Sequence, residues 1–158
     1  MVMDLFESLL QELGQIMKIE GLRPDEHNTC LIRFKDGDLE VQIEPYQKGE
    51  FLLIGCTIGV ISPGRYRENV FREALKANGL PPSRHGVFAY IAKSDRLVLF
   101  SMLSLREING EKIASFLTPF MEKALTWKQQ IKRGDVPVAE TITSGRVSGP
   151  GGLFGLIR

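Results

Sequence analysis

The sequence predicts an α+β fold in which three helices accompany a twisted, mainly antiparallel five-stranded sheet, in the order α-β-β-β-α-β-β-α. Three observations predict it. Some stretches repeat apolar residues at helical spacing, others alternate apolar and polar residues, and turn signals join successive strand-like stretches into hairpins. A chain of 158 residues, with 43% hydrophobic and 25% charged residues, suits one compact domain with a substantial core.

An amphipathic helix is predicted near the N-terminus, because apolar residues recur at helical spacing up to residue 17. Asp4, followed three residues later by Glu7, is a plausible N-terminal cap for it. Residues 30–34 and 39–44 then alternate as two strands, joined by a turn that contains an Asp-Gly pair. This first hairpin has one apolar and one polar face.

The remaining strands are more hydrophobic. Residues 51–61 are rich in β-branched residues and apolar on both faces, which is typical of a central or interface strand. Residues 87–92 and 96–103 form a second hairpin, which is also apolar on alternate positions of both faces. We therefore expect the sheet to need cover on both sides.

Two further helices are predicted from helix start and stop signals and from the spacing of apolar residues. Ser62 and Pro63 offer a cap and a first helical residue for a short helix that ends at Asn78-Gly79. The last helix begins near Asn109, and we expect Pro119 to break it because proline lacks the backbone N–H that a helix interior needs. These two helices are predicted to lie on one face of the sheet with the first.

The C-terminal segment differs in composition from the rest of the chain. Residues 134–158 hold six glycines, two prolines and few large side chains before a short apolar end. Such a segment cannot bury enough apolar surface to order itself. The predicted organisation is therefore a folded domain at residues 1–133 and a flexible Gly-rich tail at residues 134–158.

The predicted sheet carries more apolar surface than three short helices of one protomer can cover. The residues concerned are Leu52, Ile54, Ile58, Phe88, Tyr90, Val98, Phe100 and Met102. Self-association through one self-complementary patch would cover part of this surface and leave a second patch for a partner. The alternative is a monomer whose first and last helices cover opposite faces of the sheet.

The inventory of reactive side chains predicts no catalytic residue, metal ligand or cofactor site. His27 and His85 lie in polar turns, and Cys30 and Cys56 lie in apolar strands, where reduced, buried thiols are expected. A cysteine nucleophile with a histidine base is conceivable, but nothing near either cysteine indicates a lowered thiol pKa. The glycines of the tail do not follow a strand or open a helix, as a phosphate-binding loop requires.

Charge and hydropathy give no general reason to expect nucleic acid or a membrane as partner. The net charge is +1, and the longest apolar run is too short and too rich in glycine to span a bilayer. The N-terminus lacks the basic start of a signal peptide, so a cytosolic protein is expected. A nucleic-acid-binding module would rest on four basic residues of the last helix, which also suit a solvated helix end: Lys123, Lys128, Lys132 and Arg133.

Several local patterns resemble the Tir chaperone family, the class I (CesT-like) chaperones of bacterial type III secretion, over roughly residues 3–133. The pieces are Phe6-x-x-Leu9-Leu10-x-x-Leu13-Gly14, the helix from Glu68 to Leu75 with Ala77-Asn78-Gly79 after it, the hairpin from Gly86 to Leu105, and the closing helix through Trp127. The resemblance implies a homodimer in the bacterial cytoplasm that binds unfolded N-terminal segments of secreted effectors and passes them to the secretion ATPase or sorting platform.

The resemblance also implies site residues. Those of the dimer interface would be Tyr66, Val70, Phe71, Ala74 and Leu75 on the second helix, and those that contact effectors would be Leu5, Leu9, Ile16, Leu31 and Phe34. Family members are often clearly acidic, whereas this chain is almost neutral. Backbone pairing and apolar anchors would then dominate cargo binding, a mode that tolerates several cargoes. The alternative function is a dimeric adaptor for folded partners.

Overall fold

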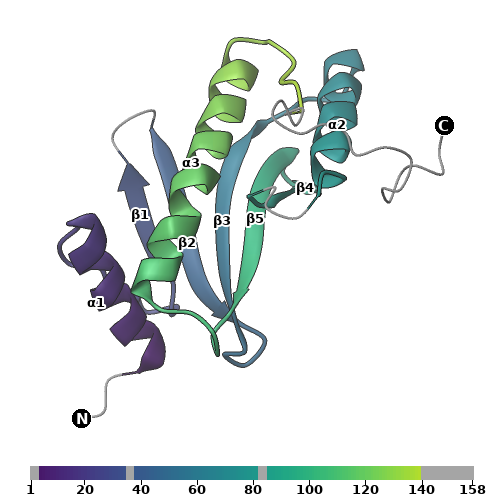
Figure 1. Ribbon diagram of the computed structural model, residues 1–158. Helices are drawn as coiled ribbons and strands as arrows, with labels where there is room; N and C mark the ends of the chain where they lie inside the picture. The colour runs from purple at the N-terminus through teal and green to yellow at the C-terminus, as the bar shows by residue number, and fades with distance from the viewer. Residues whose placement is uncertain (1–3, 35–37, 82–84, 140–158) are drawn as a thin grey trace.

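The computed structural model describes residues 4–34, 38–81 and 85–139, and it confirms the predicted α+β fold (Figure 1). The order of helices and strands is the one predicted from the sequence. The elements are α1 (Leu5–Met17), β1 (Cys30–Phe34), β2 (Leu39–Tyr46), β3 (Phe51–Val60), α2 (Arg65–Asn78), β4 (Val87–Ile91), β5 (Arg96–Ser104) and α3 (Gly110–Lys132).

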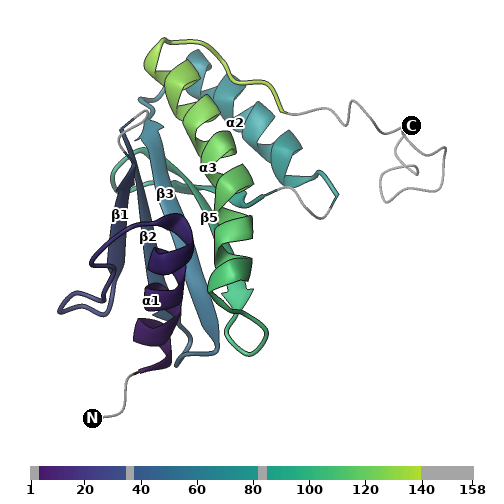
Figure 2. The same ribbon diagram turned by 60° about the vertical axis from the view of Figure 1, so that its left-hand side comes forward.

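The five strands form one antiparallel sheet in the order β1-β2-β3-β5-β4, with the ten-residue β3 at its centre. α1 and α3 lie side by side on one face, and α2 lies beside β4 at the edge (Figures 1 and 2). The opposite face carries no helix among the described residues. We call these the covered face and the open face of the sheet.

The core lies between the covered face and the two helices. Alternate residues of β3, from Leu52 to Ile58, are buried on this side, as the period of two requires. α3 contributes a stripe that includes Leu117, Phe120 and Trp127, and the Trp127 ring packs on Phe88 with centroids 4.1 Å apart. Both predicted hairpins thus place one apolar face in the core.

α3 is continuous through Pro119, so the predicted break is wrong. The helix begins as expected, because the Asn109 side chain accepts a hydrogen bond from the Lys112 N–H at 2.8 Å. The hydroxyl of Thr118, the residue before the proline, donates to the Ala114 carbonyl one turn earlier in the same helix, at 3.4 Å. Apolar residues before and after the proline pack on the same sheet, and this shared burial holds both halves in line.

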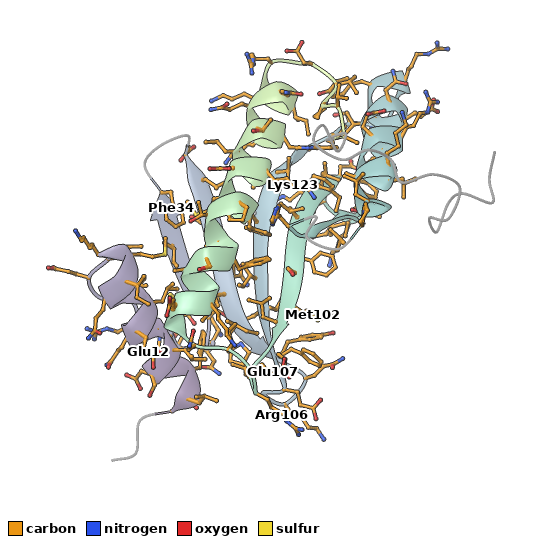
Figure 3. The ribbon with its side chains drawn as sticks, viewed as in Figure 1. Glu12, Phe34, Met102, Arg106, Glu107 and Lys123 are labelled. Atoms are coloured by element: carbon orange, nitrogen blue, oxygen red, sulfur yellow. The ribbon has the colours of Figure 1, made fainter. Side chains whose placement is uncertain are left out.

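α1 and α3 approach each other closely at Gly110, the first residue of α3. A methyl group at this position would lie 2.5 Å from the Glu12 Cβ and 2.9 Å from the Leu13 backbone nitrogen. The Gly110 N–H donates to the Glu12 carboxylate at 2.9 Å, and Figure 3 shows Glu12 on α1 near the start of α3. Asp4 is the N-cap residue of α1, as predicted, but its side chain makes no capping hydrogen bond.

α2 begins at Arg65, two residues later than the Ser62-Pro63 signal indicates, and ends at Asn78 as predicted. Asn78 connects the helix to the edge of the sheet. Its side-chain amide donates to the Phe88 carbonyl at 2.9 Å, and its side-chain oxygen accepts from the Phe88 N–H at 2.7 Å. These two hydrogen bonds occupy backbone groups of the edge strand β4.

The first residues of the predicted tail pack against α2. The Tyr66 hydroxyl donates to the Asp135 carbonyl at 2.6 Å, and the Ala139 N–H donates to the Glu73 carboxylate at 3.1 Å. Pro137 is buried in this contact region. The tail predicted to begin at residue 134 is therefore in contact with the domain up to residue 139, and residues 140–158 lie outside the described part of the chain.

Candidate binding surfaces

The open face of the sheet is a broad surface whose two halves differ in chemistry. β2 contributes polar side chains, whereas β3, β4 and β5 contribute mainly apolar ones. The hollow in this face is shallow and measures about 980 Å³. The outward residues of the open face that line it are Leu31, Glu40, Gln42, Glu44, Tyr46, Leu53, Gly55, Thr57, Val60, Ile91, Arg96, Val98, Phe100 and Met102.

Exposed apolar side chains are concentrated on this face. Nine large hydrophobic residues are exposed in the described part of the chain. Five of them line the hollow: Leu31, Tyr46, Val60, Ile91 and Met102. Figure 3 shows one of these, Met102, on β5. Apolar side chains gathered on one uncovered sheet face are a sign of a protein-binding surface.

Acidic side chains form the other half of the hollow. Glu40 and Glu44 alternate with Gln42 along β2, so all three point to the open face. The Glu40 carboxylate accepts a hydrogen bond from the Arg33 guanidinium at 2.9 Å; the Arg33 side chain is 82% exposed and the Glu40 side chain 46%. The Thr29 hydroxyl donates to the Glu44 carboxylate at 3.2 Å.

The five residues predicted to contact effectors do not share one surface. Leu5 and Ile16 are exposed on α1, whereas Leu9 is buried in the core and cannot contact a partner without unfolding of the helix. Leu31 is exposed on the open face. Phe34 lies at the end of β1, on the side of the sheet that packs against the core, and is only partly buried (Figure 3).

The five residues predicted for the dimer interface also divide into two groups. Val70 and Ala74 are buried inside the protomer, at 0% and 5% exposure, because this side of α2 packs on the domain. Leu75 is 70% exposed, and Tyr66 and Phe71 are partly buried. The predicted interface on α2 is therefore reduced to Tyr66, Phe71 and Leu75, and its role in dimerisation stays a prediction.

A polar cluster that the sequence analysis did not include fixes α2 against the second hairpin. The Arg67 guanidinium donates to the Tyr90 hydroxyl at 2.6 Å and to the Asp95 carboxylate at 3.1 Å. Tyr90 also donates to Asp95, and this hydrogen bond is the main cause that raises the pKa of the Tyr90 hydroxyl. The Phe71 ring meets Tyr90 edge-on, with centroids 4.8 Å apart. No linear spacing would indicate this cluster, because its residues lie on α2, on β4 and in the turn between β4 and β5.

The match to a family model decides the relationship of this chain to known proteins. The model of the Tir chaperone protein (CesT) family matches residues 8–128. The chain belongs to the Tir chaperone family. This confirms the predicted resemblance, and the matched residues fall inside the predicted domain.

Several solved structures share the fold of this Tir chaperone family member, although their sequences are less than 25% identical to it. SycH, a Yersinia pestis type III secretion chaperone in complex with a stable fragment of YscM2, is 22% identical, with 77% of this chain and 98% of that chain covered and a TM-score of 0.60. The HopA1–SchA chaperone–effector complex is 13% identical, with 79% of this chain and 94% of that chain covered and a TM-score of 0.65. The ExsC–ExsE complex is 18% identical, with 87% of this chain and 100% of that chain covered and a TM-score of 0.60. No curated protein matches the chain significantly.

The basic residues of α3 support the fold of this family member. The Lys123 ammonium donates to the Gly86 carbonyl at 3.1 Å and lies 4.9 Å from the centre of the Phe88 ring (Figure 3). The Lys128 ammonium donates to the Asp38 carbonyl at 2.6 Å. The Arg133 guanidinium donates to the Gln129 carbonyl at 3.4 Å, so three of the four residues considered for nucleic-acid binding have structural partners. No helix in the described residues is long and apolar enough to cross a membrane.

The two cysteines and two histidines do not form a reactive site within the described residues. Burial raises the pKa of the Cys30 thiol, and it raises the pKa of the Cys56 thiol to about 11. His27 is exposed beside Glu26, and no group of three or more His, Cys, Asp or Glu side chains in the described residues is arranged to hold a metal ion. The family itself is a chaperone family.

Thiol reactivity tests this arrangement. At pH 8, a thiol with a pKa of about 11 is ionised in roughly one molecule in a thousand, and only the thiolate is alkylated. We expect iodoacetamide to label Cys56 about 100-fold more slowly in the native protein than in 8 M urea, measured by mass spectrometry. Rapid labelling of either cysteine in the native protein would contradict a buried, inert thiol.

Proposed function

We propose that the protein is a type III secretion chaperone that acts as a homodimer in the bacterial cytoplasm. It binds the N-terminal segments of secreted effectors, keeps them unfolded and soluble, and promotes their delivery to the secretion apparatus through the secretion ATPase or sorting platform. The proposal includes several cargoes for one chaperone and requires neither a cofactor nor catalysis.

The observation that carries the proposal is the uncovered, partly apolar sheet face in a member of a chaperone family. An uncovered sheet face presents side chains at a period of two, which matches the side-chain period of an extended partner. A partner that has not yet folded also has apolar side chains available for such a surface.

A second feature supports an unfolded cargo. β1 is an edge strand of the sheet, and edge strands present backbone groups to which an extended segment can add. The other edge differs, because Asn78 of α2 already occupies backbone groups of β4. The two edges are therefore not equivalent, and strand addition is proposed for β1.

Co-expression tests the proposed function. The full-length protein is produced with tagged N-terminal fragments of secreted effectors, and the complexes are purified and measured by light scattering. We expect one fragment to co-purify with two copies of the chaperone without added nucleotide, and the bound fragment to stay sensitive to protease outside the contact region. A stable monomer that retains no fragment would contradict the proposal.

The adaptor alternative makes a different thermodynamic prediction. A segment that orders on the dimer buries a large apolar area as it folds, so its binding carries a large negative heat-capacity change. Docking of two preformed surfaces gives a smaller change. Calorimetry at several temperatures, with the isolated segment as ligand, separates the two functions.

A further inference from the structure

We propose that the hollow over Gly55 is a socket for one large apolar side chain of an extended cargo segment, with basic residues two positions before and after this side chain. The inference rests on the proposed function, because the segment is taken to be cargo. The inference specifies the sequence pattern of the cargo segment that binds here: basic-x-apolar-x-basic.

Gly55 lies at the centre of the open face, and the residues around it all carry side chains. Across the sheet it pairs with Gln42 on β2 and with Phe100 on β5. Along β3, Leu53 and Thr57 are the nearest residues on the same face, two positions away on either side. The missing side chain at Gly55 therefore leaves a depression between a polar strand and an apolar strand.

Neither the backbone nor the packing at this position requires a glycine. The φ angle of Gly55 lies outside the positive range that favours glycine. A Cβ atom there would make only ordinary contacts, 3.8 Å from the Leu99 carbonyl oxygen and 3.9 Å from the Phe100 Cβ. Glycine inside a strand weakens the strand, and it often marks a place where a ligand approaches closely. The glycine therefore serves to leave open space above position 55.

The acidic residues of β2 set the charge pattern of the partner. Glu44 lies beside Leu53, Gln42 beside Gly55, and Glu40 is two residues further along β2. A segment that runs along the strands presents alternate side chains to this face, so its residues at two positions on either side of the apolar anchor lie near the two glutamates. Lysine or arginine at these positions complements their charge.

The existing partners of these glutamates leave room for such contacts. The Arg33–Glu40 pair lies at the surface, and ion pairs at the surface contribute little to stability and rearrange readily. Thr29 occupies one oxygen of the Glu44 carboxylate. Two basic residues also line the hollow: the Lys128 ammonium already donates to the Asp38 carbonyl, and Arg96 is the first residue of β5. A second copy of the chain would bring the same two glutamates, so charge complementarity favours a basic segment.

The test uses the full-length protein and a synthetic peptide, Gly-Ser-Lys-Thr-Leu-Thr-Lys-Ser-Gly, titrated while backbone amide signals are followed by NMR. We expect shifts concentrated at Gln42, Gly55 and Phe100. Replacing the peptide leucine by serine, or both lysines by glutamate, should weaken binding about tenfold or more.

Protein variants locate the socket independently of the peptide. Gly55→Leu fills the hollow and should weaken peptide binding about tenfold, whereas Ala89→Leu adds the same bulk to the open face on β4 and should leave it within about twofold. Glu44→Lys should weaken binding and reverse the preference to the glutamate peptide. Glu122→Lys, an exposed change on α3, is its matched control.

The outcomes separate this inference from the proposed function. Peptide binding that Gly55→Leu and Glu44→Lys leave unchanged overturns the socket, even if effector fragments still co-purify with the wild-type protein. A Gly55→Leu variant that becomes a monomer also overturns it, because the hollow would then be a contact between two copies. Failure of every effector fragment to bind the wild-type protein refutes the proposed function instead.

Discussion

Replacing Gly110 by alanine is expected to destabilise the protein by about 2–3 kcal/mol, although the change adds only one methyl group. The new Cβ would lie 2.5 Å from the Glu12 Cβ and within 2.9 Å of backbone atoms of α1. Backbone atoms of a helix cannot turn aside as a flexible side chain can. α1 must therefore move away from α3, and its buried leucines lose contacts with the core.

Urea denaturation followed by circular dichroism measures this effect. The matched control is Gly55→Ala, the same chemical change at a position where the new Cβ makes only contacts of 3.8 Å or more. We expect the control to be neutral or slightly stabilising, since alanine loses less backbone entropy than glycine on folding. Equal unfolding midpoints for the two variants would show that the close approach of α1 and α3 does not constrain the fold.

Replacing Leu75 by arginine is expected to convert the proposed homodimer to a monomer. Leu75 is the most exposed apolar residue of α2, so the change leaves the core of the protomer intact. A two-fold interface would contain the arginine twice, and burying two like charges without partners costs more than a modest interface can offset. Light scattering should then report the 17.7 kDa mass of one chain instead of twice that mass.

Two controls sharpen this result. Leu5→Arg makes the same change at another exposed leucine, on α1, and should leave the mass unchanged. Circular dichroism should show the same helix content in both variants and the wild type. If Leu75→Arg stays a dimer, then the interface does not include the exposed side of α2, and the open face becomes the candidate surface for self-association. Val70 is unsuitable for this test because its substitution would damage the core.

The sequence alone was sufficient for the fold class and the order of elements. β1 begins and ends at the predicted residues, and the second hairpin agrees with its prediction to within one residue at each strand end. These elements have strong alternation and clear turn signals, which act over a few neighbouring residues. The break at Pro119 was wrong, because packing of both halves of α3 on one sheet outweighs a local hydrogen bond that proline cannot make.

The candidate sites were less accessible to sequence reasoning. Apolar spacing identified α1 and α2 as amphipathic, but it did not distinguish Leu9 and Val70, which are buried, from Leu5 and Leu75, which are exposed. Helical periodicity gives the direction of an apolar stripe and not its width or its partner. The excess of apolar residues on the strands predicted an uncovered sheet face, and Val98, Phe100 and Met102 lie on it. The same prediction was wrong for Leu52, Ile54, Ile58 and Phe88, which are buried in the core of one protomer.

The sequence by itself determined which segments form helices and strands, and that the sheet has more apolar surface than its helices can bury. Both properties depend on the pattern of neighbouring residues and on composition. Only the tertiary structure decided which face of the sheet stays open, that Gly55 lies at its centre between Gln42 and Phe100, and that Arg67 joins Tyr90 and Asp95. These relations depend on strand order and register, which bring together residues far apart in the chain.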